Sequence, residues 1–172
     1  MSSARKPMYK VRRSRVHGLG VFATRRIRKG TRIIEYLGER ISHREANRRF
    51  ARKPVDDNHT FLYSVDRGVV IDAGVNGNDA RFINHGCDPN CESVTENRRI
   101  FIDAIATIQP GEELKYDYSI GRDKDDPPNI DEIYACRCGG ENCRGTMLWP
   151  PKRPKRRATK PRAAQRRAGK RR

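Results

Sequence analysis

The sequence predicts a mainly β domain, of the β-rich α+β class, and two observations predict it. Short runs rich in Ile, Val, Tyr and Phe recur along the chain, separated by turns that contain Gly or Pro. Only residues 42–52 have the composition and start signal of a helix. The length of 172 residues predicts a single domain with tails, and no internal repeat is present.

The expected strands follow one another in chain order. Turns are predicted at 28–30, 67–68 and 109–111, because each segment contains Gly and the last also contains Pro. Tyr116 and Tyr118 are two residues apart in the last strand, so both rings lie on one face. We expect strands at residues 9–11, 18–23, 31–38, 61–66, 69–73, 99–104 and 112–118.

The predicted helix begins at Ser42. Ser42 and Glu45 have the spacing of a capping box, in which each side chain bonds the other residue's backbone N–H. Residues 1–8 before the first strand read as a flexible arm, and residues 121–131 read as an acidic, Pro-containing loop.

The charge of the chain is strongly positive and unevenly placed. The net charge is +17, the sequence pI is about 10.3, and residues 151–172 contain Lys and Arg but no acidic residue. We expect residues 150–172 to be a disordered tail that binds nucleic acid through its phosphates. A nuclear-import signal at residues 151–157 and a tail that only solubilises the protein are the alternatives.

Hydropathy excludes several classes of protein. No long apolar run is present, so no membrane span and no membrane partner are expected. The N-terminus lacks the apolar segment of a secretory signal. In a reducing compartment, cysteines serve metal binding or catalysis more often than disulfides.

The stretch from Arg81 to Cys91 concentrates residue types that can bind ligands or metals. It places an Asn, a His and two Cys beside an aromatic residue, and Gly86 and Pro89 break regular structure. The amide and the imidazole could hold a small polar ligand. A plain Asn/Gly/Asp/Pro-rich loop between two strands is the alternative.

The cysteines predict a structural zinc site. Cys136, Cys138 and Cys143 supply three soft ligands in a glycine-containing loop, and tetrahedral zinc needs four. The fourth thiolate must come from Cys87 or Cys91, which would join the two segments across space. Free or redox-active cysteines are the alternative.

Five segments together carry a resemblance to a known family. Residues 17–22, 35–39, 81–87, 111–118 and 136–143 occur in the order seen in SET-domain protein-lysine methyltransferases with a post-SET zinc motif. The chain resembles the histone-lysine methyltransferases of the mixed-lineage-leukaemia and trithorax kind over residues 9–149. It differs at Gly86, where the family's Asn-His-Ser-Cys motif has Ser.

The resemblance implies the architecture. It implies a SET-domain β-clip at residues 9–120 with a C-terminal pseudoknot, in which the segment around residues 116–118 threads past the strand at residues 84–85. Residues 121–149 would form the acidic loop and the small post-SET zinc loop.

The resemblance also implies the site. S-adenosyl-L-methionine would occupy one pocket, and the substrate lysine would enter by a narrow channel from the opposite face. Tyr118 matches the catalytic tyrosine, Tyr116 the position that sets methylation number, and Tyr36 the lysine channel. One structural Zn²⁺ would be held by Cys87, Cys136, Cys138 and Cys143. The implied cofactor-binding residues are His17, Gly18, Leu19, Gly20, Phe61, Arg81, Phe82, Asn84 and His85, with Trp149 near the cofactor's edge.

The predicted function is therefore transfer of methyl groups to protein lysine, mainly mono- and dimethylation. The expected substrate is a histone or a histone-like basic DNA-associated protein, and the enzyme is expected to be a monomer. A non-enzymatic DNA- or chromatin-binding module with a SET fold is one alternative. Methylation of a non-histone basic protein, such as a nucleoid or ribosomal protein, is another. The expected location is the nucleus or the chromosome, including a host nucleus for a secreted bacterial effector.

Overall fold

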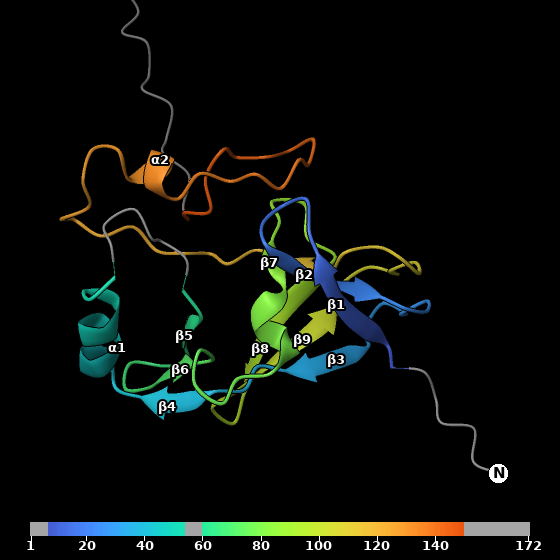
Figure 1. Ribbon diagram of the computed structural model, residues 1–172, viewed down its shortest axis with the longest axis horizontal. Coiled ribbons are helices and arrows are strands. Elements are labelled where there is room, and N and C mark those ends of the chain that lie inside the picture. The colour runs from blue at the N-terminus through green and yellow to red at the C-terminus, as the bar shows by residue number, and fades with distance from the viewer. Residues whose placement is uncertain (1–6, 54–59, 150–172) are drawn as a thin grey trace, which may run out of the picture.

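The computed structural model describes residues 7–53 and 60–149. These residues form four small sheets, two of two strands and two of three, with two short α-helices. Figure 1 shows the β1–β2 hairpin at one end of the molecule and α1 with β4, β5 and β6 at the other. The mainly β class expected from the sequence is confirmed.

The first sheet is a hairpin of β1 (Tyr9–Arg13) and β2 (Leu19–Ala23), paired antiparallel. The connection closes where the backbone N–H of Ser14 donates to the carbonyl of Gly18, at 3.0 Å. Gly18 has a φ of +42°, a conformation that L side chains rarely adopt. Gly18 therefore serves the turn of this hairpin.

The central sheet has the order β3–β9–β8, formed by Arg32–Glu35, Arg99–Ala104 and Cys91–Glu96. A two-residue turn joins β8 to β9, and both of its residues, Asn97 and Arg98, have positive φ. Such turns match the right-handed twist of the strands they connect. Strand β8 was missed in the sequence, because its Glu and Thr residues look polar.

The third sheet has the order β4–β6–β5, formed by Glu39–Ile41, Val70–Asp72 and Leu62–Ser64. The expected strand at 31–38 ends at Glu35, and β4 begins a new sheet after Gly38. A Cβ on Gly38 would lie 2.5 Å from the Asp72 carbonyl oxygen, so only glycine allows the two backbones to meet there.

Helix α1 (His43–Phe50) follows β4 and confirms the predicted helix. The Ser42 hydroxyl accepts from the Glu45 backbone N–H at 3.2 Å, as a capping residue does. The other half of the predicted capping box is absent among the described contacts. The Glu45 carboxylate pairs instead with Arg48 and Arg49, at 2.7 and 2.9 Å, since two cations one turn away attract it more strongly than one neutral N–H.

The fourth sheet pairs β7 (Asn84–His85) in parallel with β10 (Lys115–Tyr116). A short 3₁₀ helix, Asp79–Phe82, leads into β7. The strand expected at 112–118 is reduced to these two residues, because residues 112–114 bond to β2 instead, where Leu114 donates to the Val21 carbonyl. The backbone of Asn90 donates to the Lys115 carbonyl, and that of Gly86 to the Tyr116 carbonyl. Residues 115–116 therefore run alongside both ends of the 84–90 loop.

One hydrophobic core joins the sheets. It is built from the inward faces of β2, β3, β6 and β9, to which the turns at 27 and 108 add a buried isoleucine each. Full burial of such a side chain stabilises the fold by about 1.5–3 kcal/mol. The largest fully buried side chains are Val21, Ile27, Ile83, Cys91, Ile100, Ile102, Ile108, Leu114 and Leu148.

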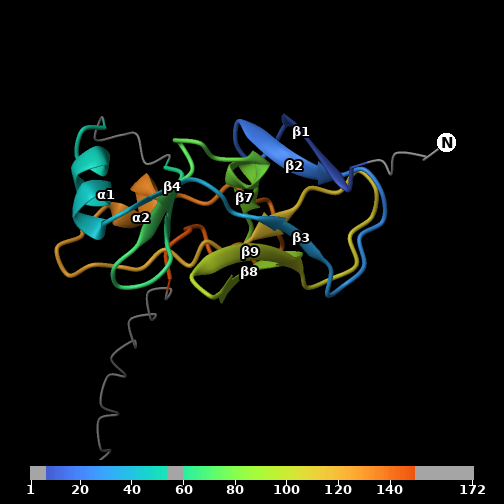
Figure 2. The same ribbon diagram turned by 90° about the horizontal axis from the view of Figure 1, so that it is seen from below.

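The segment after β10 folds back over the site. Helix α2 (Ile130–Ile133) lies in the stretch expected to be a loop, and isolated bridges join Ile120 to Leu148 and Ala135 to Thr146. Figure 2 shows this segment running back towards the α1 end of the molecule. The helices within residues 7–53 and 60–149 are too short and too polar to cross a membrane. The basic tail lies outside the described residues.

Candidate active site

A large cavity of about 1190 Å³ lies between the β1–β2 turn, the β7 loop, β5 and the segment around α2. Its volume exceeds the roughly 300–1,000 Å³ typical of small-molecule sites, so there is room for two ligand groups. Most of the residues predicted for the cofactor and the lysine line it, namely His17, Gly18, Leu19, Tyr36, Phe61, Arg81, Phe82, Asn84, His85, Tyr116 and Tyr118.

Four tyrosines gather along one wall. The Tyr116 ring lies 4.9 Å from that of Tyr118 and 6.5 Å from that of Tyr63, and Tyr63 lies 5.4 Å from Tyr36. The rings come from the segments at β10, at β5 and just after β3, so three separate segments of the sequence build one aromatic surface. Tyr63 was not predicted, although its spacing two residues after Phe61 could have indicated a second aromatic in this wall.

The four hydroxyls differ in their hydrogen bonds. Tyr118 donates to the Ile83 carbonyl at 2.8 Å, Tyr36 to the Phe61 carbonyl at 2.9 Å, and Tyr63 contacts the Ser93 hydroxyl at 2.5 Å. The Tyr116 hydroxyl has no partner among the described residues. Tyr116 therefore offers the one uncommitted phenol of the four to whatever occupies the cavity.

Burial keeps all four phenols neutral. It raises the pKa of Tyr36, Tyr63, Tyr116 and Tyr118 above the usual value, because the apolar surroundings disfavour the phenolate. The wall is thus apolar with hydrogen-bonding hydroxyls. It does not supply a phenolate base at neutral pH.

Asn84 holds the opposite wall in place. Its side-chain amide donates to the carbonyls of His17 and Leu19, at 3.3 and 2.9 Å, and to the Glu113 carboxylate at 2.8 Å. These bonds fix the backbone of residues 17–19 against the β7 strand. They also explain Gly20, because a Cβ there would lie 2.2 Å from the Glu113 carboxylate.

Arg81 lies between two aromatic rings. Its guanidinium carbon is 4.7 Å from the Phe82 ring centroid and 5.5 Å from that of Phe61. One nitrogen donates to the Ala73 carbonyl at 3.0 Å, whereas the buried Nε has no partner among the described residues. A positive group with a spare donor in a cavity wall can receive an anionic ligand group.

His85 connects the cavity to the cysteine cluster. Its Nδ1 accepts from the Tyr118 backbone N–H at 3.2 Å, which places the ring's proton on Nε2, and Nε2 lies 3.4 Å from the Cys87 sulfur. Burial lowers the pKa of His85 to about 4, so the ring is neutral. The imidazole thus orients neighbours on both sides without carrying charge.

The four predicted zinc ligands are brought together. The sulfurs of Cys87, Cys136, Cys138 and Cys143 all lie within 4.8 Å of one another, and those of Cys87 and Cys136 are 3.7 Å apart. Tetrahedral zinc with Zn–S bonds of about 2.3 Å places its sulfurs about 3.8 Å apart. The donor set and the spacing therefore fit one zinc ion.

Backbone N–H groups support this cluster. The N–H of Arg144 points to the Cys87 sulfur and that of Cys138 to the Cys136 sulfur, each at 3.4 Å, and such bonds favour thiolates over thiols. Asp88 adds a clamp, since its carboxylate accepts from the backbone and the side chain of Asn142, both at 3.1 Å.

Cys91 takes no part in the cluster. It begins β8 opposite Ala104 and is completely buried in the core. Burial raises the pKa of its thiol to about 12, which is the behaviour of a structural cysteine. Of the two cysteines that the spacing left open, the structure places Cys87 in the cluster and Cys91 in the core.

Two predicted residues lie away from the cavity. Gly20 is behind the wall, beside Glu113, and Trp149 is 48% exposed with the Arg144 guanidinium 5.2 Å from its ring. Conversely, the sequence did not indicate that the α2 region would line the cavity. Ile130, Ile133 and Tyr134 have helical apolar spacing that could have shown it. The unpredicted lining residues include Glu132, Ile133, Tyr134, Ala135, Arg137 and Met147.

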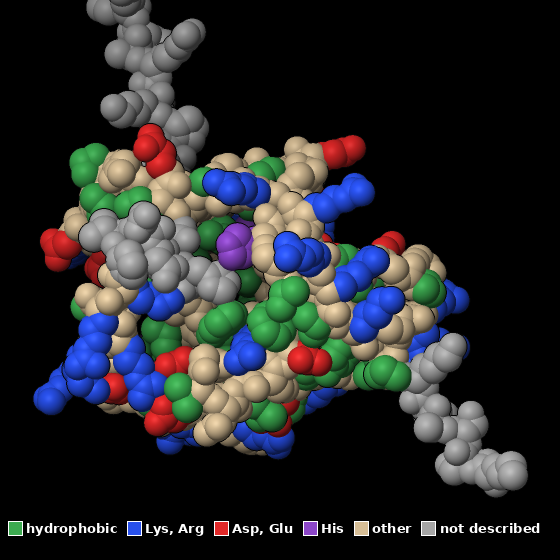
Figure 3. All heavy atoms as spheres, in the orientation of Figure 1, with side chains coloured by type: hydrophobic (Ala, Val, Ile, Leu, Met, Phe, Trp, Pro, Cys, Tyr) green, Lys and Arg blue, Asp and Glu red, His purple; other side chains and the backbone are tan. Residues whose placement is uncertain are grey.

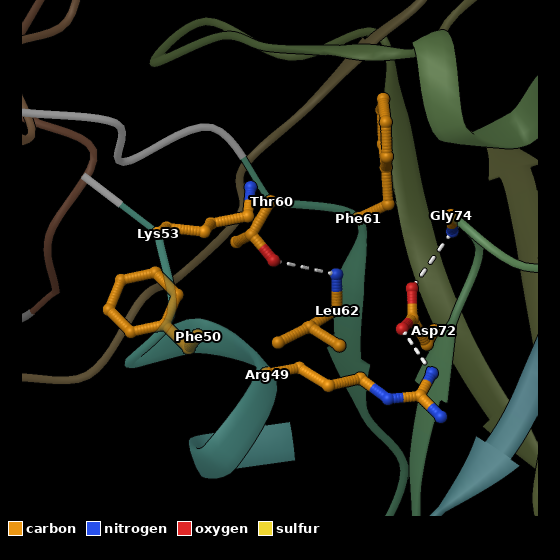
Figure 4. Close-up of a pocket in the computed structure, with 8 residues that line it drawn as sticks. All are labelled: Arg49, Phe50, Lys53, Thr60, Phe61, Leu62, Asp72 and Gly74. Atoms are coloured by element: carbon orange, nitrogen blue, oxygen red, sulfur yellow. Dashed lines mark hydrogen bonds and ion pairs between the residues drawn. The ribbon is translucent and has the colours of Figure 1, made fainter. Parts of the chain in front are cut away.

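A second, smaller pocket of about 180 Å³ lies behind Phe61, between α1 and β5–β6 (Figure 4). Its Arg49 is fully paired, at 2.7 Å to Glu39 and to Asp72. Thr60, Phe61 and Leu62 line both pockets. The smaller pocket therefore lies next to the large cavity, with Phe61 between them, and the charge of its Arg49 is already compensated.

Residues 18–119 match the family profile of the SET domain. The chain belongs to the SET-domain family. This span contains the tyrosine wall, Asn84, His85 and Cys87, while the other three cysteines follow it. The recognition made from the five segments is confirmed.

Curated relatives carry the same domain within much longer chains. A histone-lysine N-methyltransferase, H3 lysine-4 specific, of Schizosaccharomyces pombe is 41% identical over 151 residues, covering 84% of this chain and 15% of the relative. The histone-lysine N-methyltransferase ash1 of Drosophila melanogaster is 40% identical, covering 76% of this chain and 6% of the relative. The SET domain thus spans a small part of such relatives.

A solved structure supports the fold. The crystal structure of an active polycomb repressive complex 2 in the stimulated state contains a chain that is 36% identical, with a TM-score of 0.57. The match covers 63% of this chain and 14% of that one. The likeness therefore concerns the domain and not the whole of either molecule.

Proposed function

We propose that the protein is an S-adenosyl-L-methionine-dependent protein-lysine N-methyltransferase acting on a histone or a histone-like basic protein. The observation that carries the proposal is the cavity, because it joins a polar wall at Asn84 and Arg81 to a wall of neutral tyrosines in a SET domain. Its volume suits a cofactor beside an inserted lysine side chain.

The polar wall fits the cofactor. Arg81, with its spare Nε, would receive the carboxylate, and Phe61 and Phe82 present ring faces and edges to the rest of the ligand. Aromatic faces also attract a sulfonium cation. When bound, S-adenosyl-L-methionine supplies an electrophilic methyl group on that sulfonium.

The tyrosine wall would prepare the lysine. An apolar, aromatic surround lowers the pKa of the amine, so that its nitrogen enters with a free lone pair. Because Tyr118 donates its hydroxyl proton to the Ile83 carbonyl, its oxygen is left as an acceptor for an amine N–H. Holding the amine in line with the methyl group can supply several kcal/mol of the barrier.

Zinc would hold the α2 segment in place against the cavity. Cys136 belongs both to the thiolate cluster and to the cavity lining. A metal bound by the four thiolates would hold the α2 segment against Cys87, next to His85. We therefore assign zinc a structural role and no step in the chemistry.

The histone substrate is inferred from relatives whose names specify histone lysine, and in several cases H3 lysine-4. Their names also favour a nuclear or chromosomal location. The positive tail, which would follow DNA phosphates, is compatible with such a substrate.

We infer mainly mono- and dimethylation from Tyr116. Its uncommitted hydroxyl faces the cavity and can bond the amine or a water beside it, which leaves little room for methyl groups already transferred.

The test is a methyl-transfer assay with isotope-labelled S-adenosyl-L-methionine on core histones and on an extract of DNA-binding proteins, with the products identified by mass spectrometry. We expect label on lysine of a histone or a histone-like protein, and none with Tyr118→Phe. Label only on non-histone proteins would reassign the substrate. No label on any protein from a folded, zinc-loaded enzyme would support the non-enzymatic alternative.

A further inference from the structure

The folded domain carries its own positive face, separate from the C-terminal tail. Residues 1–34 contain no Asp or Glu, and the first acidic residue is Glu35. Within the described part of this stretch, every Lys and Arg is exposed. The name hairpin face is used below for Lys10, Arg12, Arg13, Arg15, Arg25, Arg26, Arg28 and Lys29.

Local folding gathers these cations on the hairpin and on the turn after it, with Lys10 and Arg12 on one face of β1 and Arg13 on the other. Lys10, Arg12 and Arg13 lie on β1, and the turn at 24–29 follows β2 beside the start of β1. The Thr24 backbone N–H donates to the Met8 carbonyl at 2.9 Å, and Ile27 pairs with Ile108. In Figure 3, Lys and Arg side chains lie over the β1 end of the molecule.

The charges of the hairpin face are largely uncompensated. Among the ion pairs of the described residues, none involves an arginine or lysine of this face. Some arginines elsewhere are neutralised, as Arg32 is by Glu96 and Asp103. Unpaired cations on a rigid hairpin are available to an anionic partner at no cost in broken ion pairs.

One arginine of the face is held in position. The Arg12 guanidinium stacks on the Phe22 ring at 3.8 Å and donates to the Gly111 carbonyl at 3.1 Å. These two contacts restrict its rotamers and leave its remaining N–H groups for a ligand. A cation that is already ordered loses less entropy on binding.

The shape of the face indicates a linear polyanion. The five-residue strands give the hairpin face a length of about 17 Å, at about 3.4 Å per residue. Duplex DNA carries one charge per about 1.7 Å of its axis, so it presents about ten phosphates over that length. A small anion would contact only a few of the cations of the hairpin face.

A membrane surface fits less well. Membrane-binding faces combine cations with large apolar side chains that enter the bilayer. Among the described residues, the large hydrophobic side chains with the highest exposure are Leu19, Leu37, Phe50, Val75 and Trp149, and only Leu19 is on the hairpin. The face itself is charged without such anchors.

We propose that the hairpin face binds duplex DNA, in addition to any binding by the tail. The face leads into the cavity, since residues 16–18 between its two strands, and Leu19 at the start of β2, line the cavity wall. DNA on the hairpin face would therefore lie beside the entrance for substrate. This deepens the proposed function, because it makes a basic protein bound to DNA the natural substrate.

The test compares two full-length variants with equal loss of charge. The face variant carries Lys10→Gln, Arg13→Gln, Arg25→Gln and Arg28→Gln. The control variant carries Arg40→Gln, Arg44→Gln, Arg52→Gln and Arg67→Gln, which are exposed residues of the opposite end. Both retain the tail, and none of the eight residues lines the cavity.

Binding to a fluorescent DNA duplex of about 20 base pairs, two helical turns, is measured over a range of salt concentrations without cofactor or protein substrate. Each phosphate contact contributes about 0.9 to the slope of log K against log salt. We expect the face variant to lower that slope by about 2 or more and the control by less than about 1. Equal slopes in the two variants, or a parental slope in the face variant, would overturn the proposal.

Methylation of a free peptide gives an independent readout. The face variant is expected to keep the parental peptide rate, which also shows that it is folded, while losing rate on the same sequence in a DNA-bound protein. The binding result does not depend on methyl transfer. An enzyme without methyl-transfer activity would therefore contradict the proposed function but not the DNA-binding proposal. Equal salt slopes in the two variants would contradict the DNA-binding proposal but not the proposed function.

Discussion

The guanidinium of Arg144 donates two hydrogen bonds to the carboxylate of Asp117, at 2.7 and 2.9 Å. Asp117 stands between Tyr116 and Tyr118 in the sequence, and Arg144 follows the zinc-ligand position Cys143. One bidentate ion pair thus ties the cysteine loop to the strand that carries two of the four tyrosines. Both side chains are mostly buried, so the pair is little screened by solvent.

The first prediction concerns this pair. Arg144→Ala removes both hydrogen bonds and the contact with Trp149, and it leaves Asp117 half-buried without a cation. We expect a loss of about 1.5–3 kcal/mol in the free energy of unfolding and a lower rate of methyl transfer. Denaturant unfolding and the transfer assay measure the two effects.

The matched control is Arg48→Gln, which breaks an exposed pair with Glu45 on α1. Such a pair contributes about 0.3–0.5 kcal/mol, and no residue of α1 lines the cavity. An Arg144→Ala enzyme as stable and as active as the control would show that the pair has no positioning role.

The second prediction is one zinc ion per chain. Cys87→Ala is expected to lose the metal, because three thiolates remain, and to weaken cofactor binding as the segment at 136–149 comes away from the cavity. Cys91→Ala is the control. It empties space in the core and lowers stability by an amount that depends on repacking, but it keeps zinc. Elemental analysis of protein purified without chelator distinguishes the two, and the reverse pattern would mean that Cys91 is the ligand.

Much of this arrangement could be predicted from the sequence. The order of five motifs specified the family, and the cysteine pattern predicted a cluster of four thiols that fits zinc. Which of Cys87 and Cys91 binds could not be derived from spacing. That choice depends on β8 pairing with β9 in a register that turns Cys91 into the core. The register in turn depends on contacts between segments far apart in the sequence.

The missed elements share the same cause. Strand β4 has only three residues, and it forms because Gly38 allows close approach to Asp72. Helix α2 lies in an acidic, Pro-containing stretch whose composition is typical of a loop, yet Ile130 is buried. Tyr63 joins the site because β5 pairs with β6, which places its ring 6.5 Å from that of Tyr116. In each case tertiary contacts outweigh a weak local preference.

The third prediction follows from the pKa of Cys91. Burial raises this pKa to about 12, above the ordinary value of a thiol, so the reactive thiolate is scarce until the pH approaches that value. In folded, zinc-free protein at about pH 8.5, the free-thiol pKa, we expect an alkylating reagent to label Cys143, which is exposed, and to leave Cys91 unlabelled. Labelling of Cys91 should appear only on unfolding. Mass spectrometry of tryptic peptides reports both sites, and rapid labelling of Cys91 in the folded state would contradict its burial.

The fourth prediction concerns Tyr118. Tyr118→Phe removes the hydroxyl that bonds Ile83 and that would accept from the amine. We expect a loss of about 1–2 kcal/mol in stability, from the unpaired carbonyl, and a fall in turnover of at least about a hundredfold, or about 2.7 kcal/mol in the barrier. Tyr9→Phe, outside the cavity, is the control. Turnover within about a factor of two of the parent, under roughly half a kcal/mol, would remove Tyr118 from the catalytic role.

The last prediction concerns the number of methyl groups. Three of the four hydroxyls are hydrogen-bonded, that of Tyr36 to Phe61, that of Tyr63 to Ser93 and that of Tyr118 to Ile83. The Tyr116 hydroxyl has no partner among the described residues. It is therefore the group best placed to bond an incoming amine, directly or through a water. Tyr116→Phe removes that bond and enlarges the space beside the amine. A methylated amine can then rotate and be attacked again, so we expect products to shift from mono- and dimethyl-lysine towards trimethyl-lysine.

Mass spectrometry of a peptide product at long reaction times measures this shift. Tyr63→Phe is the matched control, because it also removes a phenol from the wall, but one already bonded to Ser93, and its product distribution is expected to stay parental. A parent that already runs to trimethyl-lysine would contradict the assignment. So would a Tyr116→Phe enzyme with unchanged products, or an equal shift in Tyr63→Phe, since room alone and not the free hydroxyl would then set the limit.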